Sequence, residues 1–365
     1  MCSGKFLHGL LKKCFKDVAV NNRYDLPDFL TVLLEVAHTN GFLEGTCKVV
    51  SGACDAETLF NRLNDVDYRA LLNCFQEDVL KSLPAIKAGT RNRKMVLAAD
   101  LTHESYYGNH PNIWVHKKKY DKGATGSYQI LVLSVLVGTR REIIGLLPLK
   151  RGDNACELLI QLLDDLKQKL HIDGLLLDRG FDSKWLIREL KHRRIRFLLL
   201  WRKAEYHRQI FKDMGKSKWK RIRHGLPLNG KDVTFTLVFV KSIKIKGDKK
   251  AYTWVYATNM RKSKPIHYIL QYKKRWGIET LFRVLDEQRI KTKTKNITKR
   301  LFLMLVTIYL YNTWKQVLSL LEYHVTFTEY ATHIQHILEQ MHPPKPPTPR
   351  QVQTQQDIQT LLEII

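Results

Sequence analysis

The hydrophobic and polar positions of the chain change their periodicity several times, and each change marks an expected segment. Over residues 1–90, apolar residues recur at helical spacing in the stretches 27–45 and 56–83, which predicts a helical domain. Asp55 stands directly before the second stretch and is its expected N-cap. Such helices are typical both of a helix-turn-helix that reads DNA ends and of a plain helical packing module.

Short apolar runs alternate with helical patterns from residue 94 to residue 201. The expected elements follow in the order β-β-β-α-β-α-β, at residues 95–100, 127–139, 141–150, 155–170, 172–178, 183–194 and 195–201. Three strands followed by α/β crossovers predict an α/β fold with a mixed sheet flanked by helices. The strands at 95–100, 172–178 and 195–201 are apolar on both faces, so we expect them at the centre of the sheet.

Residues 202–250 are strongly basic and interrupt this alternation. Alternating apolar positions predict two strands at 231–242 and 250–259, which indicates a β-rich insertion. Helical spacing returns at 265–290, where a proline occupies the helix-starting position, and again at 300–321. The chain ends in a Pro-rich stretch that we expect to be a mobile linker followed by a short terminal helix.

The expected organisation therefore has five segments. They are a helical segment with a potential DNA-binding role (1–90), the first part of the α/β core (91–204), a basic β-containing insertion (205–260), the helices that complete the core (261–322), and a C-terminal helix with a Pro-rich tail (323–365). The most apolar run, residues 301–311, is too short for a bilayer, which needs about 20 apolar residues. We interpret it as a buried helix and expect no membrane partner.

The charge of the chain indicates the class of partner. Lys and Arg number 61 against 35 Asp and Glu, a formal net charge of +26, which favours nucleic acid over a membrane surface as the polyanion that binds. The six cysteines include no Cys-x-x-Cys pair. We therefore expect reduced, mostly buried cysteines in a cytoplasmic protein, and neither a disulfide framework nor a structural zinc site.

Two aspartates end apolar runs of the predicted sheet. Asp178 follows the run 175–177 and Asp100 follows 96–99, and ligands of open α/β sheets gather beyond the carboxyl ends of strands. Two carboxylates there would repel each other unless a cation such as Mg²⁺ bound them. Alternatively, Asp178 caps the helix that begins near Ser183, although Asp182 and Ser183 are closer to that helix start.

A third acid belongs to the helical stretch 265–290. On a continuous helix, one face would carry Tyr272, Arg275, Glu279, Arg283 and Asp286. The alternative is a solvated face with an Arg275–Glu279 ion pair. The apolar residues around these charges argue against it, because they indicate a buried helix. Gly277 in mid-helix costs about 1 kcal/mol relative to Ala, so we expect another part of the chain to approach closely there.

These residues resemble a known family. Asp100, Asp178 and Glu279 on a β-β-β-α-β-α-β frame are similar to the catalytic acids of RNase H-like DDE transposases of prokaryotic insertion sequences. The resemblance is to the type with a β-strand insertion before the glutamate helix. It rests on Asp178-Arg179-Gly180-Phe181 and on Tyr272-x-x-Arg275-x-x-x-Glu279, and it covers residues 50–320. One position departs: Asp286 stands where the family often has Lys, with Arg283 and Arg289 nearby.

The resemblance implies an RNase H-like mixed sheet and metal-dependent phosphoryl transfer on DNA. Asp100, Asp178 and Glu279 would hold two Mg²⁺ or Mn²⁺ ions, cut the ends of an insertion sequence and join them to target DNA. The implied protein is a homodimer on double-stranded DNA, cytoplasmic and nucleoid-associated. The alternatives are an RNase H-like nuclease or resolvase that cuts without joining, and an inactive DNA-binding descendant, which would not need all three acids.

The expected DNA contacts are cations and a tyrosine near these acids. They are Tyr272, Arg275, Arg283, Arg179, Lys117, Lys118, Arg193, Arg194, Arg202 and Lys203. The basic run 188–223 is the expected surface for the DNA backbone, and Lys117–Lys119 form either part of the DNA groove or a solvated basic loop. His103 either orients the substrate or is a plain structural histidine, and Trp276 is expected in the core more than on a base.

Overall fold

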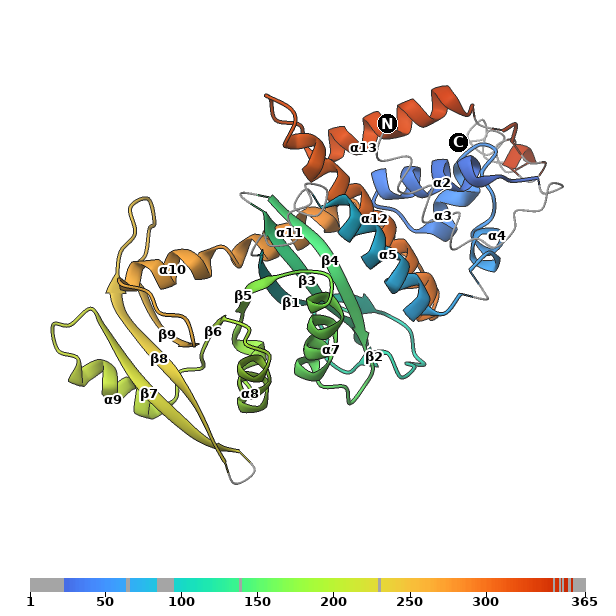
Figure 1. The fold of residues 1–365 in the computed structure, drawn as a ribbon. Coiled ribbons are helices and arrows are strands. Elements are labelled where there is room, and N and C mark those ends of the chain that lie inside the picture. The colour runs from blue at the N-terminus through green and yellow to red at the C-terminus, as the bar shows by residue number, and fades with distance from the viewer. Residues whose placement is uncertain are drawn as a thin grey trace. The chain divides into compact units, whose positions relative to one another are not determined.

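The computed structural model describes residues 23–63, 66–83, 95–137, 140–228 and 231–343, with isolated positions between 345 and 356. The chain forms two compact units, one of Ser82–Leu281 and one of Met1–Lys81 together with Phe282–Ile365 (Figure 1). We call them the sheet unit and the helical unit. Cys2, Cys14, the turn Gly138-Thr139 and most of the stretch where the short terminal helix is expected lie outside the described residues.

The sheet unit contains the predicted mixed sheet. Its first five long strands are β1 (Met95–Tyr106), β3 (Gly126–Val137), β4 (Arg140–Leu149), β5 (Ile172–Leu177) and β6 (Phe197–Leu200). The first three pair antiparallel, and β5 lies parallel to both β1 and β6. The α/β fold class is thus confirmed, with a further two-residue strand, β2 (Val115–His116), beside β3. The central position of the apolar strands is confirmed too, since Leu97 and Leu175–Leu177 are fully buried.

Two helices cover this sheet at positions that the sequence predicts. Helix α7 (Ala155–Lys167) packs on β3 and β4, and α8 (Lys184–His192) packs against α7. Asn154 caps α7 by accepting a hydrogen bond from the Cys156 amide. Ser183 caps α8 in the same way through the Leu186 amide, as expected for Ser and Asn before an amphipathic stretch.

The basic insertion continues the same sheet. It consists of α9 (Glu205–Asp213), β7 (Trp219–Leu228), β8 (Lys231–Ile243) and β9 (Tyr252–Thr258). Because β9 pairs antiparallel with β6, the strand order of the described residues runs β2-β3-β1-β5-β6-β9-β8-β7, with β4 on β3. The sequence predicts β8 and β9 but not β7, because cations interrupt the apolar alternation of that strand.

The helical unit packs segments from both ends of the chain together. Its helices are α2 (Leu26–His38), α3 (Leu43–Val49), α4 (Ala56–Asn61), α5 (Tyr68–Ser82), α12 (Ile297–Leu318) and α13 (Phe327–Met341). Helix α4 begins at Ala56, as the sequence predicts, but Asp55 makes no side-chain cap bond to it. Residues 301–311 lie within α12 and are largely buried, which confirms the buried helix. No helix among the described residues is long and apolar enough to span a membrane.

The described part of the Pro-rich tail packs against the N-terminal helices. Lys345 Nζ donates to Asp28 Oδ2 over 2.5 Å, and Gln351 Nε2 donates to the Val50 carbonyl over 2.7 Å. Gly52, at φ +68°, faces the Lys345 carbonyl so closely that a Cβ would lie 2.0 Å from its oxygen. These hydrogen bonds connect the stretch to α2 and to the residue after α3, and its mobility stays a prediction.

Candidate active site

Asp100 and Asp178 lie side by side in the register of two neighbouring strands. Strands β1 and β5 pair in parallel up to Ala98 opposite Leu176, and each acid follows two residues later. Side chains two residues apart share a face of a sheet, so both carboxylates face the same side. The sequence predicts that the first strand ends at Asp100. It continues to Tyr106, because β3 still pairs with it after β5 has ended.

The backbone after β5 explains the spacing in the segment Asp178-Arg179-Gly180-Phe181. Asp178 Oδ1 accepts a hydrogen bond from the Gly180 amide at 2.7 Å and caps the 3₁₀ turn η1 (Arg179–Phe181). A Cβ at Gly180 would lie 2.9 Å from the same oxygen. Asp178 is thus a cap, but of this turn and not of α8. Its second oxygen makes no hydrogen bond to any other described residue.

The stretch 265–290 is two helices, whereas its periodicity predicts one. Helix α10 (Pro265–Lys273) and α11 (Trp276–Glu287) are separated by a break at Lys274 and Arg275. In a continuous helix the Ile278 amide would bond to the Lys274 carbonyl, but here it bonds to the Arg275 carbonyl at 2.8 Å. The freed Lys274 carbonyl accepts two hydrogen bonds from Arg141 of β4, which stabilises the break.

Arg275 connects the glutamate helix to the first aspartate. Its Nη1 lies 2.8 Å from Asp100 Oδ2 and its Nη2 lies 2.5 Å from Glu279 Oε1. Its Nε donates to the Tyr272 hydroxyl at 3.1 Å. The ion pair considered as an alternative is thus present, but it is not a solvated surface pair, because the Arg275 side chain is only 6% exposed.

The charges of this cluster perturb one another strongly. Burial raises the pKa of Asp100 from 3.8 to about 6; Arg275 opposes this rise, while Asp178 and Glu279 add to it. Burial lowers the pKa of Arg275, but Tyr272, Asp100 and Glu279 outweigh burial, and the net shift is upward. The contact with Arg275 therefore does not offset the burial of Asp100 together with its repulsion by Asp178 and Glu279, so the net shift of the Asp100 pKa is upward.

Tyr272 belongs to an aromatic core behind Arg275. It is fully buried, its ring lies 5.5 Å from those of Trp254 and Tyr256, and burial raises its pKa to about 12. Trp276 lies 5.7 Å from Trp254, so it packs at the margin of the same core. In this conformation Tyr272 and Arg275 support the acids from within the protein, and neither presents its side chain to solvent.

The donors suit a hard divalent cation, although no finished cage is present among the described residues. Mg²⁺ prefers carboxylate oxygens and water. Burial is the main cause of the raised Asp100 pKa and the neighbouring acids add to it, and a cation would offset both effects. Within the part of the chain that the structure describes, no three His, Cys, Asp or Glu side chains are arranged to hold a metal ion. Glu279, with 59% of its side chain exposed, is free to turn away from Arg275.

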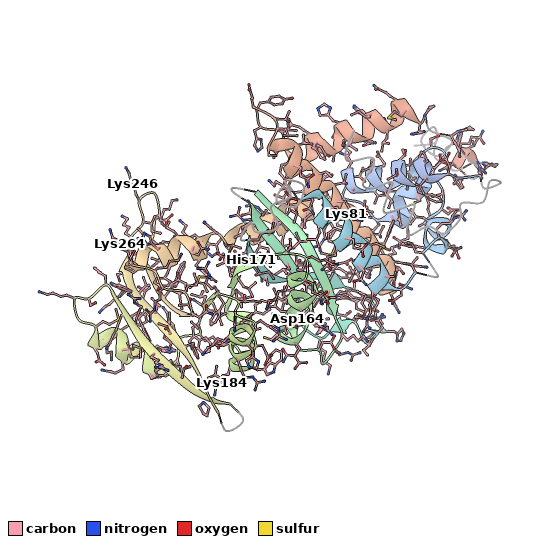
Figure 2. The ribbon with its side chains drawn as sticks, in the orientation of Figure 1. Lys81, Asp164, His171, Lys184, Lys246 and Lys264 are labelled. Atoms are coloured by element: carbon pink, nitrogen blue, oxygen red, sulfur yellow. The ribbon has the colours of Figure 1, made fainter. Side chains whose placement is uncertain are left out.

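Several of the predicted DNA contacts are exposed cations on the sheet unit. They are Arg179, Arg194, Arg202, Lys203, Lys117 and Lys118. The pKa of Lys203 is lowered by burial and by the nearby Arg179, so the cation that follows β6 lies close to the one that directly follows Asp178. Exposed lysines continue over the β8–β9 connection and the start of α10 at Lys246 and Lys264 (Figure 2).

Two predicted contacts have other surroundings. Arg193 is bound to acids of the protein, at 2.7 Å from Asp164 Oδ1 and 2.7 Å from Glu189 Oε2. Arg283 is exposed and lies on the part of α11 that belongs to the helical unit.

His103 lies on the face of β1 opposite to Asp100, because the two residues are separated by an odd number of positions along the strand. Its ring stacks on Tyr120 with the ring centroids 3.4 Å apart.

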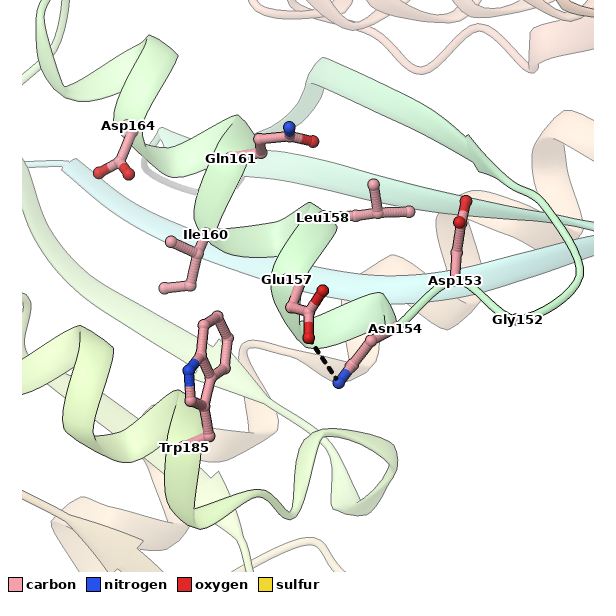
Figure 3. A pocket seen from close by; sticks show the side chains of 9 residues that line it. All are labelled: Gly152, Asp153, Asn154, Glu157, Leu158, Ile160, Gln161, Asp164 and Trp185. Carbon is pink, nitrogen blue, oxygen red and sulfur yellow. Dashed lines mark hydrogen bonds between the residues drawn. The ribbon is translucent and has the colours of Figure 1, made fainter. Parts of the chain in front are cut away.

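A cavity of about 740 Å³ lies on α7 and α8, apart from the three acids. Figure 3 shows its acidic side chains and Trp185, and Asn154 Nδ2 donates to Glu157 Oε1 at 3.4 Å within it. Neither the three acids nor Arg275 lines the cavity.

The sequence did not predict the contact that Arg141 makes with the break between α10 and α11. The one signal for it in the sequence was Gly277, a glycine in the middle of an expected helix.

Comparison with known proteins gives one family. A family model described as the transposase DDE domain matches residues 92–311. The solved piggyBac transposase synaptic complex with hairpin DNA aligns with a TM-score of 0.54 at 14% identity, over 93% of this chain and 78% of that chain. This likeness supports the RNase H-like fold. The Drosophila P element transposase strand transfer complex aligns at 0.25 and 13% identity, over 92% and 70%. No curated protein matches.

Proposed function

Since the chain belongs to the transposase DDE domain family, whose reaction is DNA transposition, we propose that Asp100, Asp178 and Glu279 are its catalytic carboxylates. They would cut the ends of a mobile element and join those ends to target DNA. The observation that carries the proposal is that residues from two strands and a later helix converge on one charge cluster, in which Arg275 contacts both Asp100 and Glu279.

The three carboxylates would hold two Mg²⁺ or Mn²⁺ ions. Bound there, the ions would activate the attacking water or DNA 3′-hydroxyl and stabilise the leaving oxygen. Asp178 would contribute the oxygen that does not cap η1. Glu279 would contribute its carboxylate once it turns from Arg275, which the exposure of this side chain permits.

The residues around the acids have separate tasks in this proposal. Arg275 compensates part of the negative charge of Asp100 and Glu279, and Tyr272 orients Arg275 through the hydrogen bond to Nε. Arg179, Arg202 and Lys203 would bind the DNA backbone beside Asp178, because exposed cations are available to phosphate oxygens. We also propose that two copies of the chain act together on the paired ends of the element.

The test is Asp178→Asn in the full-length protein, assayed for Mg²⁺-dependent nicking of end-containing DNA. Asn keeps the cap geometry but supplies no carboxylate for a metal, so we expect nicking to be lost and DNA binding to stay within about twofold, because phosphate contacts determine that affinity. Asp182→Asn, four residues along the same loop, is the matched control and should remain active. Unchanged nicking in Asp178→Asn would reject the site.

A strand-transfer assay with pre-cut ends separates the proposed function from its alternative. A transposase joins such ends to target DNA, whereas a nuclease or resolvase that cuts without joining leaves them free. We expect joined product with the unmodified protein and none with Asp178→Asn.

A further inference from the structure

We propose that Arg141 is a positioning residue of the active site, which holds the break between α10 and α11 and thereby directs Arg275 and Glu279. This inference rests on the proposed function of the three acids. Arg141 is the second residue of β4 and lies 133 residues before Lys274 in the chain. Its guanidinium donates to the Lys274 carbonyl from Nε at 3.2 Å and from Nη2 at 3.0 Å.

The carbonyl that Arg141 binds is one that the end of α10 leaves without a helical partner. A helix that ends leaves carbonyls without amide partners, and these need other donors. At this break the amides of Arg275 and Ile278 bond three residues back, to the Tyr272 and Arg275 carbonyls, each at 2.8 Å. The Lys274 carbonyl thereby has no amide donor from α11, and Arg141 supplies two charge-assisted donors in its place.

The guanidinium of Arg141 occupies a space that only a glycine leaves open. A Cβ built on Gly277 would lie 1.7 Å from Arg141 Nε and 1.9 Å from its Cζ. Any side chain at position 277 would therefore expel the guanidinium from this place. Gly277 disfavours a continuous helix and also admits the residue that replaces the missing hydrogen bond. The glycine and the arginine thus act as a pair.

The break is connected to the acids through Arg275. This residue directly follows the anchored carbonyl, and its three side-chain nitrogens bond to Tyr272, Asp100 and Glu279. If α10 and α11 joined into one helix, the backbone of Arg275 would rotate and these three hydrogen bonds would break. Glu279, four residues further along α11, would shift with it.

The experiment compares Arg141→Ala with the unmodified full-length protein in strand transfer of pre-cut ends. We expect the rate at saturating DNA to fall about 10²-fold, the size of effect that a misplacement of about 1 Å produces. The DNA concentration that gives half the maximal rate should stay unchanged, because Arg141 points to the protein. The matched control is Arg151→Ala, which removes another arginine bound to a backbone carbonyl, that of Asn112 at 3.0 Å.

Guanidinium ion separates positioning from general destabilisation. Added at millimolar concentration, it should restore part of the rate of Arg141→Ala by binding the Lys274 carbonyl. It should not restore the double variant Arg141→Ala/Gly277→Ala, whose new methyl group fills the place. The two single variants should lower the rate to a similar extent and the double variant little further, because both disrupt the same interaction.

Hydrogen exchange gives a readout without DNA or metal. Amides of residues 274–279 should exchange at altered rates in Arg141→Ala, while the central strands keep their protection. A rate for Arg141→Ala within twofold of the unmodified protein, or additive effects in the double variant, would overturn the inference. If Arg141→Ala gives such a result while Asp178→Asn is inactive in the same assay, only the role of Arg141 is rejected. If Asp178→Asn is active, the proposed site itself is wrong.

Discussion

Replacing Asp100 by Asn should make the metal-free protein more stable, although we expect it to abolish catalysis. Burial and two neighbouring acids raise the pKa of Asp100 from 3.8 to about 6. A shift of this size means that the ionised carboxylate is disfavoured by about 3 kcal/mol in the folded protein relative to the unfolded chain. Asn has the shape of the neutral acid and can still accept the hydrogen bond from Arg275, so it removes most of this cost.

The pH dependence gives the prediction its sign. Between pH 3.8 and about 6 the folded protein binds more protons at Asp100 than the unfolded chain does, so this group lowers stability as pH rises through that window. Above about pH 6 the destabilisation by ionised Asp100 has reached its full size. The stability difference between Asp100→Asn and the unmodified protein should therefore be near zero at about pH 4, grow up to about pH 6 and stay constant up to about pH 7.5.

Thermal unfolding in EDTA measures the difference. For a unit of the size of Ser82–Leu281, 1 kcal/mol corresponds to about 2–4 °C in melting temperature, so we expect Asp100→Asn to melt up to about 10 °C higher at pH 7.5. Saturating Mg²⁺ should raise the melting temperature of the unmodified protein by mass action and leave that of Asp100→Asn nearly unchanged. The difference in melting temperature between the two proteins should therefore become smaller or change sign.

Glu279→Gln is the matched control, because it changes the other acid on the same guanidinium. Its side chain is 59% exposed, so water screens the pair and the expected change is within about 1 kcal/mol. The reasoning is refuted if Asp100→Asn melts at or below the unmodified protein at pH 7.5 in EDTA. It is also refuted if the same difference persists at pH 4.

Two further predictions concern the cations of the sheet unit. The double variant Arg202→Gln/Lys203→Gln should bind DNA more weakly. The slope of log binding constant against log salt concentration should become flatter by about 0.9 for each phosphate that is no longer neutralised. Fluorescence anisotropy over a salt series measures this slope, and an unchanged slope contradicts the assignment of these residues to DNA binding. Arg193→Ala should leave this slope unchanged but destabilise the fold by about 1–2 kcal/mol, because the guanidinium of Arg193 binds Asp164 and Glu189. Thermal unfolding of Arg193→Ala and of the unmodified protein measures the difference.

The order of the core elements along the chain, and the place of Asp178 after a central strand, were predictable because their signals are local. An apolar run buried on both faces reads as a central strand, and a charge at its end is visible in the sequence itself. The register places Asp100 beside Asp178 without any long side chain to assist. The full length of β1 was not predictable, because its second half depends on pairing with β3 and not on its own pattern.

The break between α10 and α11 could not be predicted from periodicity. Tyr272, Arg275 and Glu279 keep helical spacing, so the local pattern favours one helix. Arg141 supplies the competing interaction from a strand 133 residues away, and such an interaction leaves no periodic trace. Gly277 was a signal that something approaches the helix, but it did not say that a side chain would replace a backbone hydrogen bond.

The two alternative interpretations of Glu279, as a catalytic acid and as half of an ion pair, are compatible in the structure. A solvated pair would expose both partners, but here the cation is buried and the acid is not. Arg275 contacts Asp100 and Glu279 together, while Asp178 adds to the field at Asp100. Within this cluster one guanidinium faces three carboxyl groups, so the acids outnumber the cation. That imbalance weakens the metal-free site. In the proposed function it would also favour a bound divalent cation, because such an ion would offset both the burial of the Asp100 charge and its repulsion by Asp178 and Glu279.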